Sequence, residues 1–474
     1  MTTLVGHCVG ETTDLPIRQE ADIDTSEVKC CLDSRRVMQT AIPCPAPGTW
    51  VPAVHAKCHH NEVAALLKRS LAPTPTPVPG QEGPVLAVFR TLRRVAGRYR
   101  GQRWGYLETA QSYSGAMCRR YLEAQSSLML DGPIRSSDYK LRAFVKAEKV
   151  KPWSVSKPRM IYPRSPRYNL VLASWLKPFE HWLWGNLKSR AFSGVGNSRV
   201  VAKGLNPVQR ANLIVRKMSQ LSDCFGRTDC GVKFSREGGR ASGDFNTGMG
   251  NSLIMLAVVV GTLSRQGAGK WDVLVDGDNA LLFLPGSDAE RVYATFADTA
   301  LKLSGHEMTL ERPTRVVEEV RFGQSAPVRC EGGWKMVREW RKVLSHSTSS
   351  HHHLREPRFA VEHLRGVSLC ETSLSHGVPI LWAFTRRLLA LTEGVEPRRL
   401  HSLRDYQILG VDLDRLQTQG AREPDDEARQ SFHLAFGVDA DGQRIIEDSF
   451  SHIDIQVVAG ELKRVTDEYG LVFE

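Results

Sequence analysis

The chain has 474 residues, 41% of them hydrophobic and 24% charged, an ordinary composition for a soluble globular protein whose length suits two or three lobes. Its 63 Lys and Arg residues against 52 Asp and Glu give a formal net charge of +11. The ten cysteines are scattered through a chain too long to need disulfide staples, which predicts free thiols in a reducing compartment. The longest apolar run, residues 253–263, is shorter than the about 20 residues that span a bilayer, so no transmembrane segment is expected.

Residues 1–83 are predicted to form a loosely structured leader followed by a linker. The first residues, MTTLVGHCVGETTDLP, contain neither a basic leader nor an apolar core, so no secretory signal is expected. The Pro-rich stretch APTPTPVPGQEGP, residues 72–84, can continue neither helix nor sheet. We therefore expect the folded body to begin near Val85.

Residues 84–200 combine predicted helices with two basic clusters. Apolar residues recur at helical spacing from Val85 to about residue 130, and residues 168–187 are also helix-like. The first cluster has six arginines interleaved with aromatic residues, and the second, residues 141–170, has eight basic residues and one acid among strand-like pieces and prolines. Clustered cations with aromatics suit a phosphate backbone and stacked bases, although a solvated helix face explains the first cluster equally well.

Two motifs follow, SGDFNTGMGN at residues 242–251 and VDGDN at residues 275–279. The first places small residues where a backbone must pass close to a ligand, and it opens into a helix that is apolar on nearly all sides and therefore buried. Asn251 could read a ribose 2′-hydroxyl. The second lies between WDVLV and ALLFLP, a pattern that predicts a β-hairpin with Asp278 at its tip.

The spacing of the two motifs suits nucleotidyl transfer. That reaction uses two divalent cations held by carboxylates from neighbouring strands, and a hairpin tip carrying Asp278, flanked by Asp276 and Asn279, is one such source. Taken alone, the hairpin is more often only a turn, and capping by Ser or Asn explains either loop residue. These alternatives do not explain the loop followed about 25 residues later by the hairpin.

The remaining elements are predicted more simply. Residues 288–305 are helical, EVRFGQSAPVR is strand-like, and the rest is mostly helix. HSTSSHHH, residues 346–353, is expected to be a flexible polar loop.

An ordered series of motifs resembles one family from about residue 85 to the C-terminus: FVKAEK, KPRMIYPRSPRYN, WLKPFE, KGLN, GGRASGDFNTGMGN, DGDN, EEVRFGQSAPV, GWKMVR and ARQSFHLAFG. It resembles the RNA-dependent RNA polymerases of tombusvirus-like positive-strand RNA viruses. The resemblance implies an α+β right-hand polymerase with fingers at residues 84–200, a palm with an antiparallel sheet at 201–340 and a mostly helical thumb at 341–474. The turn at residues 322–328 looks like the primer grip.

The resemblance also implies the residues of the site. It assigns the incoming triphosphate to Lys146, Lys149, Lys157 and Arg159, the template and ribose to Ser242, Gly243, Thr247 and Asn251, and metal binding and catalysis to Asp278 with Asn279, beside Asp276. The cofactor implied is Mg²⁺ or Mn²⁺. The family usually has a second Asp where this chain has Asn279, so a shift toward manganese is a hypothesis.

The first palm motif of the family, a strand with two aspartates followed by a long helix, is predicted to be missing. Residues 206–224 read as the preceding helix and residues 226–240 as a hairpin, which leaves no room for a strand and a helix before Ser242. Asp223 and Asp229 lie at nearly the right spacing, but the Gly-rich surroundings of Asp229 do not favour a strand. A junction near Cys224 and Phe225, with a block removed, fits better, and it predicts little or no elongation.

The sequence thus predicts a viral RNA-directed RNA polymerase whose own activity is in doubt. A non-catalytic RNA-binding remnant is the alternative, and a reverse transcriptase is disfavoured by Asn251 and by the fingers motif. The expected partners are template and nascent RNA, nucleoside triphosphates and other viral replication proteins. The expected location is the host cytoplasm, at membrane-associated sites reached through those partners.

Overall fold

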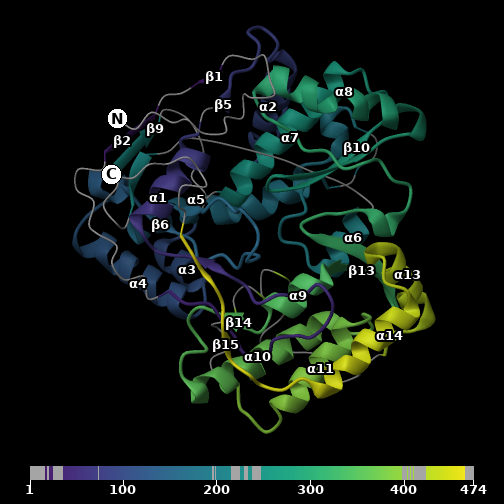
Figure 1. Ribbon diagram of the computed structural model, residues 1–474. Helices are drawn as coiled ribbons and strands as arrows, with labels where there is room; N and C mark the ends of the chain where they lie inside the picture. The colour runs from purple at the N-terminus through teal and green to yellow at the C-terminus, as the bar shows by residue number, and fades with distance from the viewer. Residues whose placement is uncertain are drawn as a thin grey trace.

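The computed structural model (Figure 1) describes residues 17–18, 21–24, 36–72, 74–194, 197, 199–214, 225–228, 233–236, 247–397, 403, 406, 409, 411 and 423–464. These residues form a mixed helix and sheet structure, as expected for the α+β class.

A long apolar helix, α7 (Thr247–Arg265), lies at the centre of one core, and α2 (Gly83–Ala96) and α8 (Gly286–Ser304) pack against it. The α2 helix can approach closely because Gly261 has no side chain. A Cβ atom at this position would lie only 3.0 Å from the backbone nitrogen of Val85. By length and composition residues 248–265 could cross a membrane, but half of this stretch is buried inside the protein, as in an ordinary core helix. The predicted buried helix is confirmed.

Three further helices pack together beside this core: α3 (Tyr106–Gln111), α4 (Gly115–Leu130) and α5 (Pro166–Asn186). Their apolar positions, among them Tyr121, Leu128 and Leu170, are buried in a shared cluster, which is what the helical spacing predicted. Ser165 caps α5 by accepting a hydrogen bond from the amide of Arg167 at 3.1 Å.

A five-stranded sheet has the order β2-β9-β8-β6-β7 and consists of β2 (Ala21–Asp24), β9 (Lys233–Arg236), β8 (Phe225–Thr228), β6 (Leu141–Val145) and β7 (Met160–Ile161). Only the β6 to β8 pairing is parallel. The β8 and β9 strands form the hairpin predicted for residues 226–240, which is thereby confirmed. Residues 215–224 lie outside the described residues.

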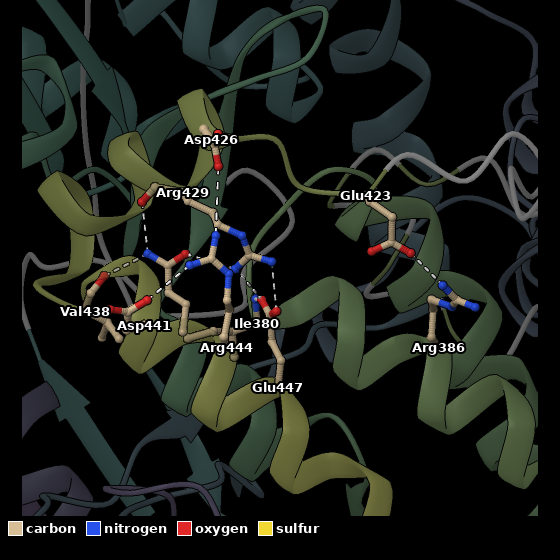
Figure 2. Close-up of polar contacts among 10 residues, drawn as sticks. Ile380, Arg386, Glu423, Asp426, Arg429, Val438, Asp441, Arg444 and Glu447 are labelled. Carbon is tan, nitrogen blue, oxygen red and sulfur yellow. Dashed lines mark hydrogen bonds and ion pairs between the residues drawn. The ribbon is translucent and has the colours of Figure 1, made fainter.

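The C-terminal third contains a hairpin and a group of helices: β12 (Ser325–Cys330), β13 (Gly333–Arg338), α9 (Trp340–His346), α10 (Pro357–Ser375), α11 (Leu381–Leu391), α13 (Asp426–Phe436) and α14 (Ala440–Ser449). Figure 2 shows how α13 and α14 are joined to α11: Arg429 contacts both carboxylate oxygens of Glu447 at 2.9 and 3.1 Å, and Glu447 also accepts the Ile380 amide at 2.8 Å. The pair is largely buried, so its bidentate geometry fixes the angle between helices.

The expectation of a loosely structured leader is wrong for most of residues 36–75, so the folded body begins well before Val85. Residues 59–70 are helical and largely buried, and residues 74–75 pair as a strand with residues 17–18. Residues 36–58 are here called the N-terminal segment. Strand β3 (Gln39–Thr40) pairs with β14 (Ser349–Ser350) and β15 (Val458–Ala459), and Ile42 is fully buried among the C-terminal helices. On its other side, Ala53 exchanges backbone hydrogen bonds with Val150 at 2.9 and 3.0 Å. The N-terminal segment has no long apolar run, because it is buried a few residues at a time between the C-terminal helices and the stretch that follows β6.

The expectation of a flexible loop at residues 346–353 is also wrong for its first half. Thr348, Ser349 and Ser350 are buried, and Ser349 shares a 2.8 Å hydroxyl hydrogen bond with Thr40. Small hydroxyl side chains can be buried when they find partners, and strand pairing with β3 satisfies the backbone as well.

The C-terminal stretch returns over this junction. Figure 1 shows the yellow chain leaving α14, passing β15 and running toward α1 (His59–Ala65). Its last strand, β16 (Leu462–Lys463), pairs in parallel with β4 (Val54–His55). The N-terminal segment and the C-terminal stretch therefore both join the C-terminal helices to the region of β6.

If the N-terminal segment is part of the core, Ile42→Ala should lower the free energy of unfolding by about 2–5 kcal/mol, because it leaves a cavity in a closely packed site. Val37→Ala is a matched control, since Val37 is 40% exposed, and should change it by less than about 0.5 kcal/mol. Denaturant titration of the transition that reports the C-terminal helices measures both. Equal midpoints for the two variants would contradict the packing described above.

Candidate functional site

The predicted hairpin is confirmed: β10 (Asp272–Asp276) and β11 (Asn279–Phe283) are antiparallel, and Asp276 lies opposite Asn279. The two-residue turn has Gly277 at its first position with φ of 63°. Glycine at this position and positive φ are what a type II′ hairpin turn requires. Asp278 is the second turn residue, and its carboxylate is exposed at the tip.

The tip lies against the start of α7. Ser252, which has no exposed surface, accepts a hydrogen bond from the Gly277 amide at 2.9 Å. The preceding residue, Asn251, is half-buried in the same helical turn. Thr247 begins the helix, although its side chain is not described, and Ser242 and Gly243 lie outside the described residues. The structure therefore brings the Asn251 turn and the Asp278 tip together.

Cations surround the base of the tip. Arg210, from α6 (Pro207–Ile214), makes a 2.5 Å ion pair with Asp276. Burial lowers the pKa of Arg199, and the nearby charge of Asp276 offsets part of that effect. The ammonium of Lys203 reaches α7, where it lies directly against Gly248. These three cations were not predicted as site residues, because single arginines and lysines in a helix or loop carry no sequence signal.

The residues expected to hold the triphosphate lie in the loop between β6 and β7, residues 146–159, here called the β6–β7 loop. Lys146 and Arg159 are neighbours, joined by a 2.8 Å backbone hydrogen bond, and both pair with Glu148, at 2.9 and 3.4 Å. Lys149 donates to the carbonyl of His346 at 2.5 Å, and Lys157 is exposed. The structure brings Lys146 and Arg159 together and directs Lys149 toward α9.

A series of side-chain contacts runs from the β6–β7 loop toward the β10–β11 hairpin. Burial lowers the pKa of Lys342 and the charge of Glu148 partly offsets this, and the Lys342 ammonium donates to the side chain of Gln324. Gln324 belongs to a tight turn in which Phe322 and Ser325 exchange backbone hydrogen bonds at 2.9 and 3.2 Å. This is the turn expected as the primer grip.

The guanidinium of Arg210 lies 5.9 Å from the ring of Phe322, at the other side of this turn. A cavity of about 240 Å³ opens there, lined by Arg210, Asp276 and Phe322 on one side and by Leu374 and Leu381 on the other. The turn thus contacts Arg210 beside the β10–β11 hairpin on one side and Lys342 on the other.

The described residues fit one part of a metal site. Asp278 offers an exposed carboxylate, but Asp276 is already neutralised by Arg210, and Asn279 donates its amide to Asp278 at 3.3 Å. No group of three or more His, Cys, Asp and Glu side chains suited to an ion occurs in the described residues. A second carboxylate would have to come from another part of the chain.

With this geometry in place, the comparisons identify the class: the chain belongs to the viral RNA-dependent RNA polymerase family. The family description "Viral RNA dependent RNA polymerase" matches residues 53–228 and 220–458, so the match begins before residue 85, where the resemblance was expected to start. Its two segments meet at residues 220–228.

Curated relatives are RNA-directed RNA polymerases of plant viruses. That of Tobacco necrosis virus (strain A) is 27% identical over 450 aligned residues, with 82% of this chain and 61% of the relative covered. Those of Tomato bushy stunt virus (strain Cherry) and Cucumber necrosis virus are 27% and 28% identical over 480 residues, with 88% of this chain and 56% of each relative covered. The chain thus spans between 56% and 61% of the length of these relatives.

Each alignment has more positions than the number of residues that this chain contributes to it. For Tobacco necrosis virus, 82% of 474 residues is about 389, roughly 60 fewer than the 450 aligned. For Tomato bushy stunt virus, 88% of 474 is about 417, again roughly 60 fewer than 480. About 60 aligned positions of each relative therefore have no counterpart here.

The contact between tip and helix predicts the effect of Ser252→Ala. The variant leaves the Gly277 amide without its partner, so we expect a loss of about 1–3 kcal/mol in stability and faster amide hydrogen exchange across residues 272–283. Thr262→Val is the control, because the Thr262 hydroxyl donates only to the carbonyl of Val258 in the same helix. Equal exchange rates in the two variants would mean that Ser252 does not hold the tip.

The Glu148 contacts predict a pH dependence. Burial alone would raise the pKa of Glu148, but the hydrogen bond from Lys146 and the charges of Lys146, Arg159 and Arg69 together lower it below its ordinary value of 4.5. A lowered carboxyl pKa stabilises the fold above the unfolded-state value and ceases to do so as the pH falls through the folded-state value.

The wild type should therefore have a higher melting temperature than Glu148→Gln near neutral pH, and the difference should vanish in acid below about pH 4. Thermal unfolding monitored from about pH 7 to about pH 3 measures it. Glu393→Gln, at an exposed position outside any ion pair of the described residues, should follow the wild type throughout. A difference between wild type and Glu148→Gln that persists unchanged in acid would contradict this account.

Proposed function

We propose that this chain is the polymerase portion of a viral RNA-directed RNA polymerase, built to join nucleoside triphosphates to an RNA 3′ end on an RNA template. In that reaction the 3′-hydroxyl attacks the α-phosphorus and pyrophosphate leaves, with Mg²⁺ or Mn²⁺ supplying charge stabilisation when bound. The observation that carries the proposal is the contact between the Asp278 tip and the Asn251 turn. Family membership supports it independently.

The proposed roles follow from chemistry and position. Asp278 would contribute one carboxylate to the metal, with Asn279 beside it as a neutral oxygen ligand, and Asp276 only after release from Arg210. Asn251 would accept or donate to the ribose 2′-hydroxyl, together with Ser242, Gly243 and Thr247 on the template side. Lys146, Lys149, Lys157 and Arg159 would bind the triphosphate, because their side chains carry the positive charge that phosphate oxygens attract, and two of them converge on Glu148.

We further propose a right hand with fingers at residues 84–200, palm at 201–340 and thumb at 341–474, in which the first palm strand and its following helix are missing. Two facts support the missing block: the two segments of the family match meet at residues 220–228, and about 60 aligned positions have no counterpart. A strand and a helix fit within about 60 residues.

A second candidate function, RNA binding without synthesis, is favoured by one observation. Arg210 already neutralises Asp276, so the charge that a metal would require there is taken by a side chain. The basic loop would keep its affinity for phosphates whether or not the chain catalyses transfer.

We also propose that the chain acts in the host cytoplasm, at membrane-associated replication sites that it reaches through other viral replication proteins. The packing of α7 among α2 and α8 supports this, since that helix is committed to a protein core. Flotation with vesicles, carried out with and without those partner proteins, tests the proposal.

Primer extension in Mg²⁺ and in Mn²⁺ tests the catalytic proposal. The chain should bind a primer-template RNA but extend it weakly or not at all. Any incorporation should be stronger in Mn²⁺, because Asn279 replaces a carboxylate, and should be abolished by Asp278→Ala without loss of RNA binding. Robust extension by the unaltered chain in either metal would contradict the missing block.

A restoration experiment sharpens the result. The corresponding segment of the Tomato bushy stunt virus polymerase, inserted between Cys224 and Phe225, should restore extension in a manner sensitive to Asp278→Ala. Asp298→Ala is the control, since that exposed acid pairs with Lys302 on its own helix, α8. If the insertion folds and binds RNA but stays inactive, RNA binding alone becomes the better description.

A further inference from the structure

An exposed tryptophan lies on a cationic surface where the β6–β7 loop meets α9. Trp153 is 67% exposed, although it is a large aromatic side chain. Its ring stands edge-on to that of Trp50, with centroids 6.0 Å apart and an interplanar angle of 77°. The two rings come from segments about 100 residues apart in sequence, so the pairing is a product of the fold.

Trp50 is held firmly beneath it. The indole N–H of Trp50 donates to Nε2 of His346 at 3.1 Å, and the two rings are perpendicular. Burial first, and then the charges of Lys149, Lys342 and Lys151, lower the pKa of His346 to about 3. His346 is therefore neutral near pH 7 and remains able to accept this hydrogen bond. Trp153 thus stands on a fixed support.

The charges beside the two rings are cationic. The ammonium of Lys151 lies 4.7 Å from the ring of Trp50 and 5.9 Å from that of Trp153. The nearby acids are occupied: Glu148 by Lys146 and Arg159, and Glu339 by the backbone amides at the start of α9. An exposed ring beside the ammonium of Lys151 suits a ligand that is both planar and anionic.

We propose that Trp153, supported by Trp50 and flanked by Lys151, is a stacking platform for the bases of single-stranded RNA. The proposal rests on the proposed function and adds a binding site to it. Single-stranded nucleic acid is the occupant because its unpaired bases offer free faces while its phosphates match the lysines. A duplex satisfies only the second condition. The same loop carries Lys146 and Arg159, so the platform would hold the strand beside the proposed triphosphate site.

Fluorescence anisotropy with a labelled RNA oligonucleotide of mixed sequence tests the proposal. Trp153→Ala should weaken binding of the single strand by about 5- to 150-fold, the effect of losing one base stack. Trp153→Phe should retain most of the affinity. Binding of the same RNA as a blunt duplex should change by less than about 2-fold, because its bases are stacked on one another.

Trp175→Ala is the matched control. Trp175 is 57% exposed and has the guanidinium of Arg103 at 5.4 Å from its ring, but it lies on α5. It should bind both RNAs as the wild type does. Lys151→Ala should reduce the slope of log affinity against log salt by about 0.7, whereas Trp153→Ala should leave that slope unchanged.

The outcomes separate the two proposals. Wild-type affinity in Trp153→Ala, with an unchanged melting temperature, overturns the platform, as does an equal loss in Trp175→Ala or an equal loss for duplex RNA. If the unaltered chain binds no RNA at low salt, the proposed function itself fails. A folding defect in Trp153→Ala is resolved by Trp153→Phe, which must then bind like the wild type for the platform to stand.

Discussion

The hydrogen bond from the Gly277 amide to the buried Ser252 hydroxyl is the contact on which the site depends. A two-residue turn by itself fixes the strands that flank it but not their orientation toward the rest of the protein. Because α7 is buried between α2 and α8, its first turns are a rigid support. The Ser252 contact transfers that rigidity to the tip, so Asp278 and Asn251 keep their relative position although both are at the surface of the core.

The second constraint is the connection between the C-terminal helices and the region of β6. The N-terminal segment contributes β3 to a sheet with β14 and β15, and its backbone bonds to Val150 on the other side. The C-terminal stretch repeats the connection through β15 and β16. Two separate segments, one near each end of the chain, thus limit how far the C-terminal helices can move from the β6–β7 loop.

The sequence predicted the elements whose cause is local. The Asp-Gly turn between apolar runs predicted the hairpin with Asp278 at its tip, the all-round apolar pattern predicted α7 as a buried helix, and helical spacing predicted α2 to α5. The errors concern residues 36–75, which have many apolar side chains but no long apolar run, and residues 348–350, which are small and polar. The pairing of β3 with β14 and β15 helps to bury both. Their partners lie some 300 residues away, beyond the reach of any pattern in a window of sequence.

The same limit applies within the site. Asp276 and Asp278 look alike in the motif, yet one is paired with Arg210 and the other is exposed. No spacing rule connects Arg210 to Asp276, since they come from different elements that meet only in the fold. Sequence could name the carboxylates but could not say which of them was already neutralised.

This difference has an energetic meaning. Neighbouring carboxylates repel one another unless a cation is present. A guanidinium can supply that positive charge at close range, as Arg210 does beside Asp276. The pair is partly exposed, so its own contribution to stability is modest. The ion pair alters which carboxylate is open to a cation. Asp276 is occupied by the Arg210 guanidinium, whereas Asp278 is exposed and accepts a hydrogen bond from the Asn279 amide.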